Sequence, residues 1–591
     1  MKYGNIQTGR FVERPNRFIA YVEMAGKTEK VHVKNTGRCR ELLVPGTEVY
    51  LEKSDNESRS TAYDLVAVKK QGRIVNMDSN APNKAVGEWL LKKELFRDLT
   101  VVRPEMTYRN SRFDFYVECG EKKAFIEVKG VTLENDNVVS FPDAPSERAV
   151  KHVKELIQAK KEGYETVIIF VIQMKGVSFF EPNEKTQPEF AAVLREARKA
   201  GVDIKAYDCN VTKESMEIGE EVPVILSVLD KISTPLLAWY DRQHRILPWR
   251  EEPTGYRVWV SEIMLQQTRV EAVKPYYERF LKFLPDIPSL AGANEDVLLK
   301  LWEGLGYYNR VRNMQKAAKL MMEKYGGKMP EEYEELLTLP GIGSYTAGAV
   351  SSIAYGRKVP AVDGNVLRVI SRLRMDDSDI LSAQVKKAVE QDLSDAMPER
   401  RAGDFNQAMM ELGAMVCVPN GMAKCGECPL NNLCQAHKED RVMEFPVKAE
   451  KKPRTVEKKT VLIIKDENRA AIHKRPNKGL LAGLYEFPSL EGHKTKDQVI
   501  RVLKEWGLNP IFIQSLESSK HIFSHKEWHM KGYAVRVDEL MPVDGKEQGF
   551  LFVEPDETEE KYPIPSAFAA YTKYLNIKLG NEKFKKDERK K

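Results

Sequence analysis

Four of the seven cysteines lie within eighteen residues, and their thiolates could hold a metal ion or an iron–sulfur cluster. They are Cys417, Cys425, Cys428 and Cys434, with the spacing C-x7-C-x2-C-x5-C. In a chain for which we expect a cytoplasmic location, such crowding favours metal binding over disulfide bonds. A [4Fe–4S] cluster and a tetrahedral zinc ion both fit the spacing, which does not separate iron from zinc.

A glycine-containing turn and an aspartate follow each other in the same part of the chain. The string LPGIGSYTA at 339–347 has the form of a helix-hairpin-helix turn, in which Gly341 and Gly343 let backbone amides approach a DNA phosphate. About twenty residues later, Asp363 stands where a helix should begin. It could be a plain N-cap, or a carboxylate that stabilises a developing cation at a sugar carbon. The two interpretations are compatible.

A third group of residues could bind a divalent cation. Asp114 is followed thirteen residues later by Glu127, which forms a Glu-x-Lys pair with Lys129. Alternate residues of a strand share a face, so Glu127, Lys129 and an Asp114 on the neighbouring strand could surround Mg²⁺. This is the layout of restriction-endonuclease-like nucleases, with Glu88 on the preceding helix as a further carboxylate. The alternative is a solvated strand face.

The elements that position these residues divide the chain into regions with different secondary-structure patterns. A length of 591 residues predicts about three to five domains. Short β-type segments separated by turns predict a small barrel at 1–82. Alternating helices and strands predict an α/β domain at 83–230, with a helix near 86–95 and a closing strand at 222–226. A mostly helical domain is expected at 231–446, and a second α/β domain at 456–579.

Composition excludes some classes of protein. With 42% apolar and 30% charged residues the chain is expected to fold, and its net charge of +6 is only a weak hint of a polyanionic partner. The longest apolar runs, such as VIIFVI at 167–172, are far too short to span a bilayer. The first residues, MKYGN, have no hydrophobic segment after the lysine. We therefore expect a cytoplasmic, nucleoid-associated protein with no membrane partner.

Several strings in the helical region closely resemble adenine DNA glycosylases of the MutY type, a branch of the endonuclease III superfamily. They are LPWR at 247–250, VWVSEIMLQQT at 258–268, WEGLGYY at 302–308 and FNQA at 405–408. The resemblance covers about residues 231–445. It implies removal of adenine mispaired with 8-oxoguanine or guanine in double-stranded DNA, after the adenine is flipped out of the helix.

The resemblance also implies roles for individual residues. Glu262 would be the acid that protonates the leaving adenine, and Asp363 would stabilise the oxocarbenium-like sugar. Gln267 would wedge into the duplex and Tyr308 would intercalate beside 8-oxoguanine. The remaining substrate and DNA contacts are expected at Trp249, Arg250, Gly341, Gly343, Tyr345, Asn365 and Gln407.

One position indicates whether the enzyme also cuts the DNA backbone after it removes the base. Members of the superfamily that also cut the backbone carry a lysine two residues after the second hairpin glycine, where it forms a Schiff base with the sugar. Here that residue is Tyr345, which predicts a monofunctional enzyme that leaves an abasic site. The alternative is a bifunctional pyrimidine glycosylase of the endonuclease III type. By the same resemblance the cysteines would hold a structural [4Fe–4S] cluster, although the first gap is seven residues where the best-known members have six.

The C-terminal region resembles the Nudix-like domain of the same family. The string GLLAGLYEFP at 479–488 carries this likeness, and Phe523, Ser524 and His525 match the loop that probes 8-oxoguanine. The acidic string with which Nudix hydrolases bind metal is missing, because RVLKEWGL at 501–508 keeps one carboxylate. This domain is therefore expected to recognise the lesion and not to hydrolyse.

The first 228 residues or so closely match the sugar fermentation stimulation protein A (SfsA) family. The matching strings include NTG at 35–37, IEVKGVTL at 126–133 and FPDAPSER at 141–148. The family implies a small OB-like barrel and a nuclease-like domain, and it is described as DNA-binding with uncertain activity. Two hypotheses stay open: a metal-dependent nuclease, or a DNA-binding regulatory module without activity. The whole chain is expected to be a monomer.

Overall fold

The computed structural model describes residues 1–580, apart from 36, 57, 94, 450–452 and 541–548. The chain divides into two compact units. Unit 1 is Met1–Lys231 and unit 2 begins at Ile232, one residue from the expected boundary. Thr36 of the NTG string lies outside the described residues. Among the helices that the structure describes, none is long and apolar enough to cross a membrane.

Unit 1 begins with an OB-like barrel. Its strands follow the order β3-β2-β1-β4-β5-β6, and parallel pairing of β3 with β5 closes the sheet on itself. Alternating residues such as Val31 and Val33 point into a common core. The strands are β1 (Ile6–Glu13), β2 (Ile19–Met24), β3 (Lys27–Val33), β4 (Glu48–Lys53), β5 (Tyr63–Lys70) and β6 (Arg73–Asn76).

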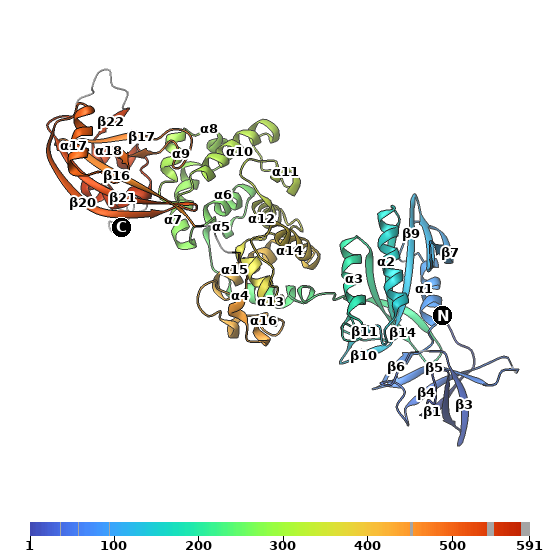
Figure 1. Ribbon diagram of the computed structural model, residues 1–591. Coiled ribbons are helices and arrows are strands. Elements are labelled where there is room, and N and C mark those ends of the chain that lie inside the picture. The colour runs from blue at the N-terminus through green and yellow to red at the C-terminus, as the bar shows by residue number, and fades with distance from the viewer. Residues whose placement is uncertain (36, 57, 94, 450–452, 541–548, 581–591) are drawn as a thin grey trace. The chain divides into compact units, whose positions relative to one another are not determined.

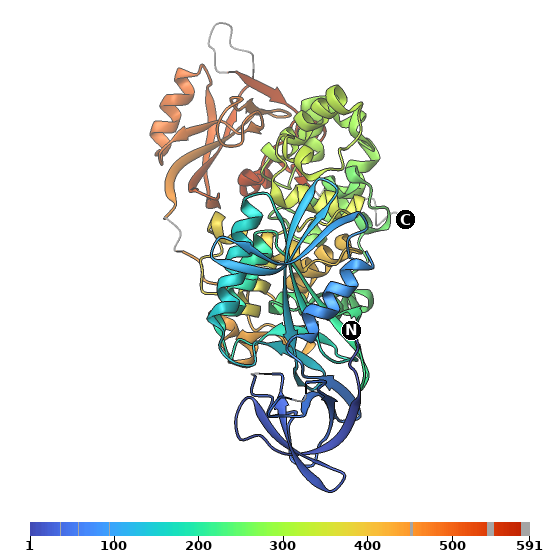
Figure 2. The same cartoon turned by 90° about the vertical axis from the view of Figure 1, so that its right-hand side faces the viewer.

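An α/β domain completes unit 1, and its central strands β9, β12 and β14 run parallel. Helix α1 packs on one face of this sheet, while α2 and α3 cover the other (Figure 2). The sheet order is β15-β14-β12-β9-β8-β7, and β10, β11 and β13 form a separate small sheet. The elements are α1 (Ala81–Leu91), β7 (Leu99–Tyr108), β8 (Ser111–Cys119), β9 (Lys122–Val131), β10 (Leu133–Asn135), β11 (Val138–Phe141), α2 (Glu147–Lys161), β12 (Glu165–Ile172), β13 (Phe179–Pro182), α3 (Pro188–Lys199), β14 (Asp203–Val211) and β15 (Met216–Glu221).

Two sequence predictions in this domain need correction. The expected helix at 86–95 begins earlier, at Ala81, because Pro82 suits the first turn of a helix, where its missing N–H costs nothing. The expected strand at 222–226 is only an isolated bridge between Phe180 and Val224. Pro223 has no N–H to donate to a ladder, which explains why the pairing does not extend.

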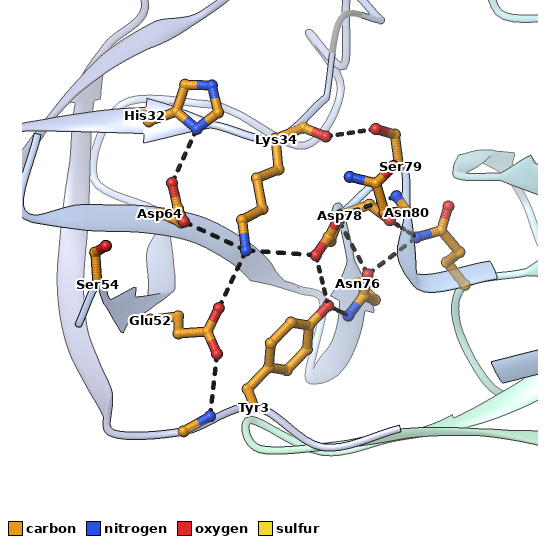
Figure 3. A network of polar contacts seen from close by, with 12 residues as sticks. Tyr3, His32, Lys34, Glu52, Ser54, Asp64, Asn76, Asp78, Ser79 and Asn80 are labelled. Atoms are coloured by element: carbon orange, nitrogen blue, oxygen red, sulfur yellow. Dashed lines mark hydrogen bonds and ion pairs between the residues drawn. The ribbon is translucent and has the colours of Figure 1, made fainter. Parts of the chain in front are cut away.

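A buried polar network joins the barrel to the α/β domain (Figure 3). At its centre Lys34 Nζ lies 3.1 Å from Glu52, 3.3 Å from Asp64 and 3.7 Å from Asp78. Asn76 donates to Tyr3, and Gln173, which follows β12, donates to Asn76 across the domain boundary. Because such charges are stable in the interior only when paired, the network fixes how the two domains of unit 1 meet.

Unit 2 begins with a helical domain, in which α12 packs against α6 and α15, and α15 packs against α13 (Figure 1). Helix α6 is buried on nearly all sides, which follows from its largely apolar sequence. The helices are α4 (Ser233–Gln243), α5 (Pro248–Glu251), α6 (Gly255–Leu265), α7 (Val270–Phe283), α8 (Ile287–Gly292), α9 (Glu295–Leu301), α10 (Asn309–Tyr325), α11 (Tyr333–Leu337), α12 (Ser344–Tyr355), α13 (Gly364–Arg374), α14 (Ala383–Ala396), α15 (Ala402–Met415) and α16 (Gln435–Lys438).

Unit 2 ends in a Nudix-like α/β domain. Its sheet follows the order β18-β17-β16-β21-β20, with β19 beside β16 and β22 beside β17. Helix α17 packs on one face, over the cluster that contains Leu462 and Val535. The elements are β16 (Thr455–Lys465), β17 (Ala470–Lys474), β18 (Tyr485–Glu486), β19 (Ser489–Glu491), α17 (Lys496–Glu505), β20 (Pro510–Ile522), β21 (Lys526–Val537), β22 (Phe550–Val553), α18 (Pro555–Glu560) and α19 (Ala569–Thr572).

Candidate active site

A cavity of about 740 Å³ lies among α5, α6, α12, α13 and α15 of unit 2. Its lining brings together side chains from well-separated stretches of the chain, and most of the residues predicted to act on the substrate belong to it. They are Trp249, Arg250, Glu262, Gln267, Tyr345, Asp363, Asn365 and Gln407.

Glu262 has the environment of a carboxylic acid. It is 6% exposed on α6, and Tyr345 from α12 donates a hydrogen bond to its carboxylate. Burial raises the pKa of Glu262 to about 7, and the nearby charge of Asp363 adds to this, against the opposing effects of Tyr345 and Arg250. A carboxyl with this pKa is half protonated near neutral pH, as a general acid requires.

Asp363 is both an N-cap and a member of the cavity. Its Oδ1 accepts from the Val366 backbone N–H at 2.8 Å at the start of α13, and its Oδ2 accepts from Asn365 Nδ2 at 2.7 Å. Burial raises the pKa of Asp363, while these hydrogen bonds act in the opposite direction. The N-cap interpretation is therefore correct, and it leaves the carboxylate beside Glu262.

Glu411 was not predicted from the sequence, yet it holds one wall of the cavity. It is 1% exposed, and its carboxylate accepts from Arg250 at 2.9 Å and from Arg245 at 2.8 and 2.9 Å. Burial opposes its ionisation, but the two arginines lower the pKa of Glu411 to about 2. Its position four residues after Gln407 on α15, and so on the same helix face, could have identified it.

The helix-hairpin-helix turn has the geometry of an anion-binding nest. Gly341 has φ +79, and a Cβ there would lie 2.7 Å from Asn313 Cβ. Gly343 is the N-cap of α12 and has open space around the position of a Cβ. The first backbone amides of a helix have no partner within it, and a helix N-terminus favours an anion such as a phosphate.

Gln267 is exposed immediately after α6, with a left-handed φ of +58. Arg310, which was not predicted, holds this region from α10. Its guanidinium donates to the carbonyls of Ile263, Met264 and Gln266, and also to those of Leu305 and Gly306. One side chain thus fixes both the loop that carries Gln267 and the loop before Tyr307 and Tyr308.

The structure corrects the role expected of Tyr308. Its ring is 5% exposed and belongs to the hydrophobic core of the helical domain, whereas the ring of Tyr307 is 49% exposed. The difference in exposure arises at a tight turn, where Tyr307 has φ +47 and Tyr308 leads directly into α10. Tyr307 is therefore the tyrosine available to DNA in this conformation.

A second cavity, of about 520 Å³, lies between the helical and Nudix-like parts of unit 2. Phe523, Ser524 and His525 line it together with Tyr307, and the hydroxyls of Tyr307 and Ser524 are 3.2 Å apart. The Phe523 ring packs on Trp528 with centroids 4.9 Å apart. The loop predicted to probe the damaged base therefore adjoins the exposed tyrosine.

The four clustered cysteines gather beside α13. Arg372 Nη1 donates to Cys417 Sγ at 3.3 Å, and Cys434 Sγ lies 3.4 Å from the Arg372 carbonyl oxygen. Burial, and then the charge of Cys417, raises the pKa of Cys425. Within the described ranges no three His, Cys, Asp or Glu side chains are arranged around a single metal ion. Four thiolates are the donor set of a [4Fe–4S] cluster and also of a structural zinc ion.

The carboxylates predicted in unit 1 meet at β8 and β9. Asp114 accepts from the Val128 N–H at 2.7 Å, and burial, followed by the charge of Glu127, raises its pKa. Glu127 is 1% exposed and accepts from Lys129 and from His152 of α2, a residue that was not predicted. Its Oε2 is buried without a hydrogen-bond partner, as expected of an atom that would contact a cation.

Glu88 does not belong to this group. Its side chain is 60% exposed and pairs with the N-terminal amine of Met1 at 2.8 Å. Helix α1 instead contributes Asn83, which donates to Asp114 Oδ1 at 2.7 Å. The expectation that Glu88 supplies a further metal carboxylate is therefore wrong, because its position on α1 turns it toward the chain start.

Comparison with known proteins agrees with this division of the chain. Residues 12–77 match the SfsA N-terminal OB domain, and residues 80–215 match the sugar fermentation stimulation protein RE domain. A sugar fermentation stimulation protein homologue from Clostridium beijerinckii is 57% identical over 226 residues, which are 38% of this chain and 100% of the relative. The chain belongs to the sugar fermentation stimulation protein family.

This family member is also a fusion. Residues 260–399 match the HhH-GPD superfamily of base excision DNA repair proteins, and residues 460–574 match the NUDIX domain. The prediction of an SfsA-like protein joined to a DNA glycosylase domain and a Nudix-like domain is therefore confirmed. Glu262 and Asp363 fall inside the glycosylase match, while Arg250 and the four cysteines lie outside it.

Two solved structures are also similar to parts of the fusion. Pyrococcus furiosus SfsA in complex with Ca²⁺ is 29% identical, over 38% of this chain and 98% of that one, with a TM-score of 0.35. A non-covalent endonuclease III–DNA complex is 26% identical, over 36% of this chain and 99% of that one, with a TM-score of 0.32.

The tyrosine pair gives a first prediction. Tyr307→Ala should weaken binding to lesion-containing duplex by about tenfold, because it removes a stacking ring, while stability changes little. Tyr308→Ala should instead lower the free energy of unfolding by about 3 kcal/mol through loss of core packing. Fluorescence anisotropy and urea unfolding of both variants measure the two effects. Equal loss of DNA binding in a correctly folded Tyr308→Ala protein would contradict this assignment.

Proposed function

We propose that unit 2 is a monofunctional adenine DNA glycosylase that acts on adenine opposite 8-oxoguanine or guanine in double-stranded DNA. The observation that carries this proposal is the buried Glu262 carboxyl, whose pKa lies at about 7, next to the Asp363 carboxylate in one cavity. The HhH-GPD match supports a base-excision glycosylase, and the motif resemblance supports adenine as its base.

The chemistry follows from the two carboxyl groups. Adenine is a poor leaving group until a ring nitrogen is protonated, and Glu262 supplies that proton as the bond to the sugar breaks. The sugar becomes oxocarbenium-like, and the Asp363 carboxylate stabilises its positive charge. Water then adds to the sugar carbon, which leaves an abasic site. Tyr345 holds Glu262 in place, and the Glu411–Arg250 pair fixes the opposite wall.

Tyr345 also limits the reaction to base removal. It occupies the position of the lysine that forms a Schiff base in bifunctional relatives, and a phenol held in a hydrogen bond to Glu262 cannot form that linkage. The chain therefore has no amine at this position with which to cut the backbone. We propose that the Nudix-like domain reads 8-oxoguanine through Phe523, Ser524 and His525.

The test is a duplex with one 8-oxoguanine:adenine pair, incubated with the full chain and then treated with or without hot alkali. Strand breaks that appear only after alkali support the proposal. Breaks without alkali would favour a bifunctional endonuclease III-type enzyme, and a duplex with thymine glycol in place of the mispair tests that alternative directly. An adenine that stays intact would defeat the proposal.

We further propose that Cys417, Cys425, Cys428 and Cys434 hold a [4Fe–4S] cluster. When bound, the cluster would cross-link the segment after α15 and stabilise the domain. Arg372 holds the same segment, since it donates to Cys417 Sγ and to the carbonyls of Val418 and Phe445. These hydrogen bonds orient the loop that contains the extra residue.

The cysteine site gives a second prediction. Purified protein should contain iron and be brown, because an iron–sulfur cluster absorbs visible light. A zinc ion has no visible absorbance, so the colour distinguishes the two. Cys428→Ser should lose most of the iron and lower the melting temperature by several degrees. Cys119→Ser, which changes a half-buried cysteine of unit 1, is the matched control. A colourless protein that binds one equivalent of zinc would overturn the assignment.

For unit 1 we propose DNA binding and Mg²⁺-dependent nuclease activity at Asp114, Glu127 and Lys129. The partnerless Glu127 Oε2 supports a cation at this position, which would activate water and neutralise a scissile phosphate. The alternative is a DNA-binding regulatory module without activity.

The nuclease hypothesis gives a third prediction. Cleavage of DNA should require Mg²⁺ and should fall by at least about 100-fold in Asp114→Ala and in Lys129→Ala. Glu88→Ala should cleave like the wild type, because Glu88 lies apart from the site. A gel assay with chelator, Mg²⁺ or Mn²⁺ measures these effects. Stable DNA binding without cutting under any of these metals would favour the regulatory module.

A further inference from the structure

Unit 1 contains a small polar cavity that the carboxylate site does not use. Its volume is about 180 Å³, roughly that of six water molecules at ~30 Å³ each. The residues that matter for the argument are Asn35, Gly37, Gly130, Ser140, Asp143 and Gln173. This volume suits one planar ring system and not a complete nucleotide.

The cavity lies where ligands commonly bind in α/β domains. Strands β9 and β12 are parallel neighbours, and Gly130 and Gln173 lie at their carboxyl ends. Crevices at the carboxyl ends of parallel strands are the usual ligand sites of open α/β sheets. Asn35 and Gly37 of the barrel form the opposite wall, and OB barrels are oligonucleotide-binding folds. The strings at 35–37, 126–133 and 141–148 all contribute residues to this cavity.

Two acceptors line the cavity, and no residue in the described part of the chain donates a hydrogen bond to either. Among the described residues no donor forms a hydrogen bond to the Asp143 carboxylate. Gln173 is 2% exposed, and its Nε2 donates to Asn76 Oδ1 at 3.0 Å and to the Asp78 carbonyl at 3.1 Å. These bonds fix the amide, so its Oε1 is the atom turned to the space beside Gly130. Acceptors that line a cavity in this way can take hydrogen bonds from water or from a ligand.

Two glycines allow these acceptors to approach the backbone closely. A Cβ on Gly37 would lie 2.4 Å from Asp143 Oδ2, and a Cβ on Gly130 would lie 2.7 Å from Gln173 Oε1. Neither glycine has a left-handed φ, so the backbone conformation does not require glycine at either position. Each glycine therefore allows an acceptor to lie closer to the backbone than any side chain would permit.

The rim next to Gly37 is basic and partly aromatic. Arg14 draws two loops together by donating to the carbonyls of Arg17, Asn35, Gly37 and Arg38. The side chains of Arg17, Arg38 and Arg40 are exposed, and Phe18 is 50% exposed. Exposed arginines combined with an aromatic ring are typical of surfaces that bind single-stranded nucleic acid.

We propose that this cavity binds one guanine base of single-stranded DNA, with Asp143 as the residue that reads it. The proposal rests on the DNA-binding role proposed for unit 1 but concerns a different site from Asp114 and Glu127. Gly130 directly follows Lys129 on β9, and three residues of strand span about 10 Å. A DNA strand with a phosphate at the carboxylate site would therefore pass close enough to place one of its bases in the cavity.

Guanine fits because the cavity offers acceptors. The Watson–Crick edge of guanine presents N1–H and N2–H₂ side by side, which matches the two oxygens of one carboxylate. Adenine and cytosine each present one amino group on this edge, together with ring acceptors that Asp143 would repel. Thymine presents a single N–H between two carbonyls. Gln173 Oε1 can accept a further hydrogen bond from the guanine amine.

The experiment compares single-stranded oligonucleotides of twelve thymidines that carry one central guanosine, adenosine or cytidine. Binding to the full chain is measured by fluorescence anisotropy in EDTA, which excludes cleavage. We expect the guanosine strand to bind at least about fivefold more tightly than the adenosine strand. Asp143→Asn, Gly37→Ala and Gly130→Ala should each remove most of this preference. Gly4→Ala, a glycine with open space around it, should preserve it.

Two outcomes overturn the proposal and can be told apart. Melting curves first establish that each variant folds, and Asp143→Asn, which adds no volume, serves if the glycine variants do not. If Arg38→Ala/Arg40→Ala weakens all strands equally while Asp143→Asn keeps the guanine preference, unit 1 binds DNA without this pocket. If the wild type shows no preference and the arginine variant binds as tightly as the wild type, the DNA-binding role of unit 1 fails as well.

Discussion

Glu262→Gln should reduce removal of adenine from an 8-oxoguanine:adenine duplex by at least about 100-fold in single-turnover assays. Glutamine has nearly the shape of glutamic acid and keeps the contact with Tyr345, but it has no proton to give the leaving base. The loss should therefore appear in the rate of the chemical step, while the affinity for the duplex stays close to that of the wild type. A variant that retains most of the rate would contradict the acid role.

The pH dependence of the wild-type rate should report the same residue. The active form of Glu262 is protonated, and its pKa lies at about 7 because burial disfavours the charge. The rate should therefore be high below pH 7 and fall as pH rises through this value. Tyr345→Phe removes a hydrogen bond that lowers the pKa of Glu262, so the fall should move to higher pH. A rate that does not change between pH 6 and about 8.5 would count against this mechanism.

Stability provides an independent control on Glu262. A carboxyl whose pKa is raised in the folded state does not lower the free energy of unfolding below pH 4.5, its ordinary pKa. Above about pH 7 it must ionise while buried, and the full loss of stability then applies. At about 1.4 kcal/mol per pH unit this amounts to about 3 kcal/mol. Glu262→Gln cannot ionise, so it should be more stable than the wild type at pH 8 and gain much less at pH 5. Urea unfolding at the two pH values measures the difference.

The sequence could predict those site residues whose roles depend on neighbours in the same segment of the chain. The N-cap position of Asp363 is local, because an aspartate just before an apolar-periodic stretch satisfies the first amides of a helix. The layout of Asp114, Glu127 and Lys129 was also predictable, since strand alternation places Glu127 and Lys129 on one face. The domain order followed from changes in periodicity along the chain, and the comparisons confirm it.

Residues that act across distant segments were harder to predict. Glu411 meets Arg245 and Arg250 over more than 160 positions, and Arg310 reaches carbonyls at the end of α6 from α10. Helix periodicity could have placed Glu411 on the same face as Gln407, but the local sequence does not show which distant residues Glu411 and Arg310 contact. The choice between Tyr307 and Tyr308 failed for another reason. It depends on a positive φ at Tyr307, which a non-glycine residue adopts only when tertiary packing requires it. Glu88 failed because the chain start folds back onto α1.

Asp363→Asn should separate the two roles of this residue. Asparagine caps a helix about as well as aspartate, so it can still accept from the Val366 N–H and keep α13 intact. It cannot supply the negative charge that stabilises a cationic sugar. We therefore expect a melting temperature close to that of the wild type and a loss of at least about 100-fold in the rate of adenine removal.

Asp363→Ala gives the matched comparison, because it removes the cap as well as the charge. It should lose the same activity and also about 1 kcal/mol of stability. If Asp363 were only an N-cap, the asparagine variant would be active and the alanine variant would lose activity only in proportion to its unfolding. If the charge is catalytic, the two variants are equally inactive at a temperature where both are folded. Rates measured at 25 °C, well below the melting transition of each variant, decide between these outcomes, and they do so without reference to the pH profile of Glu262.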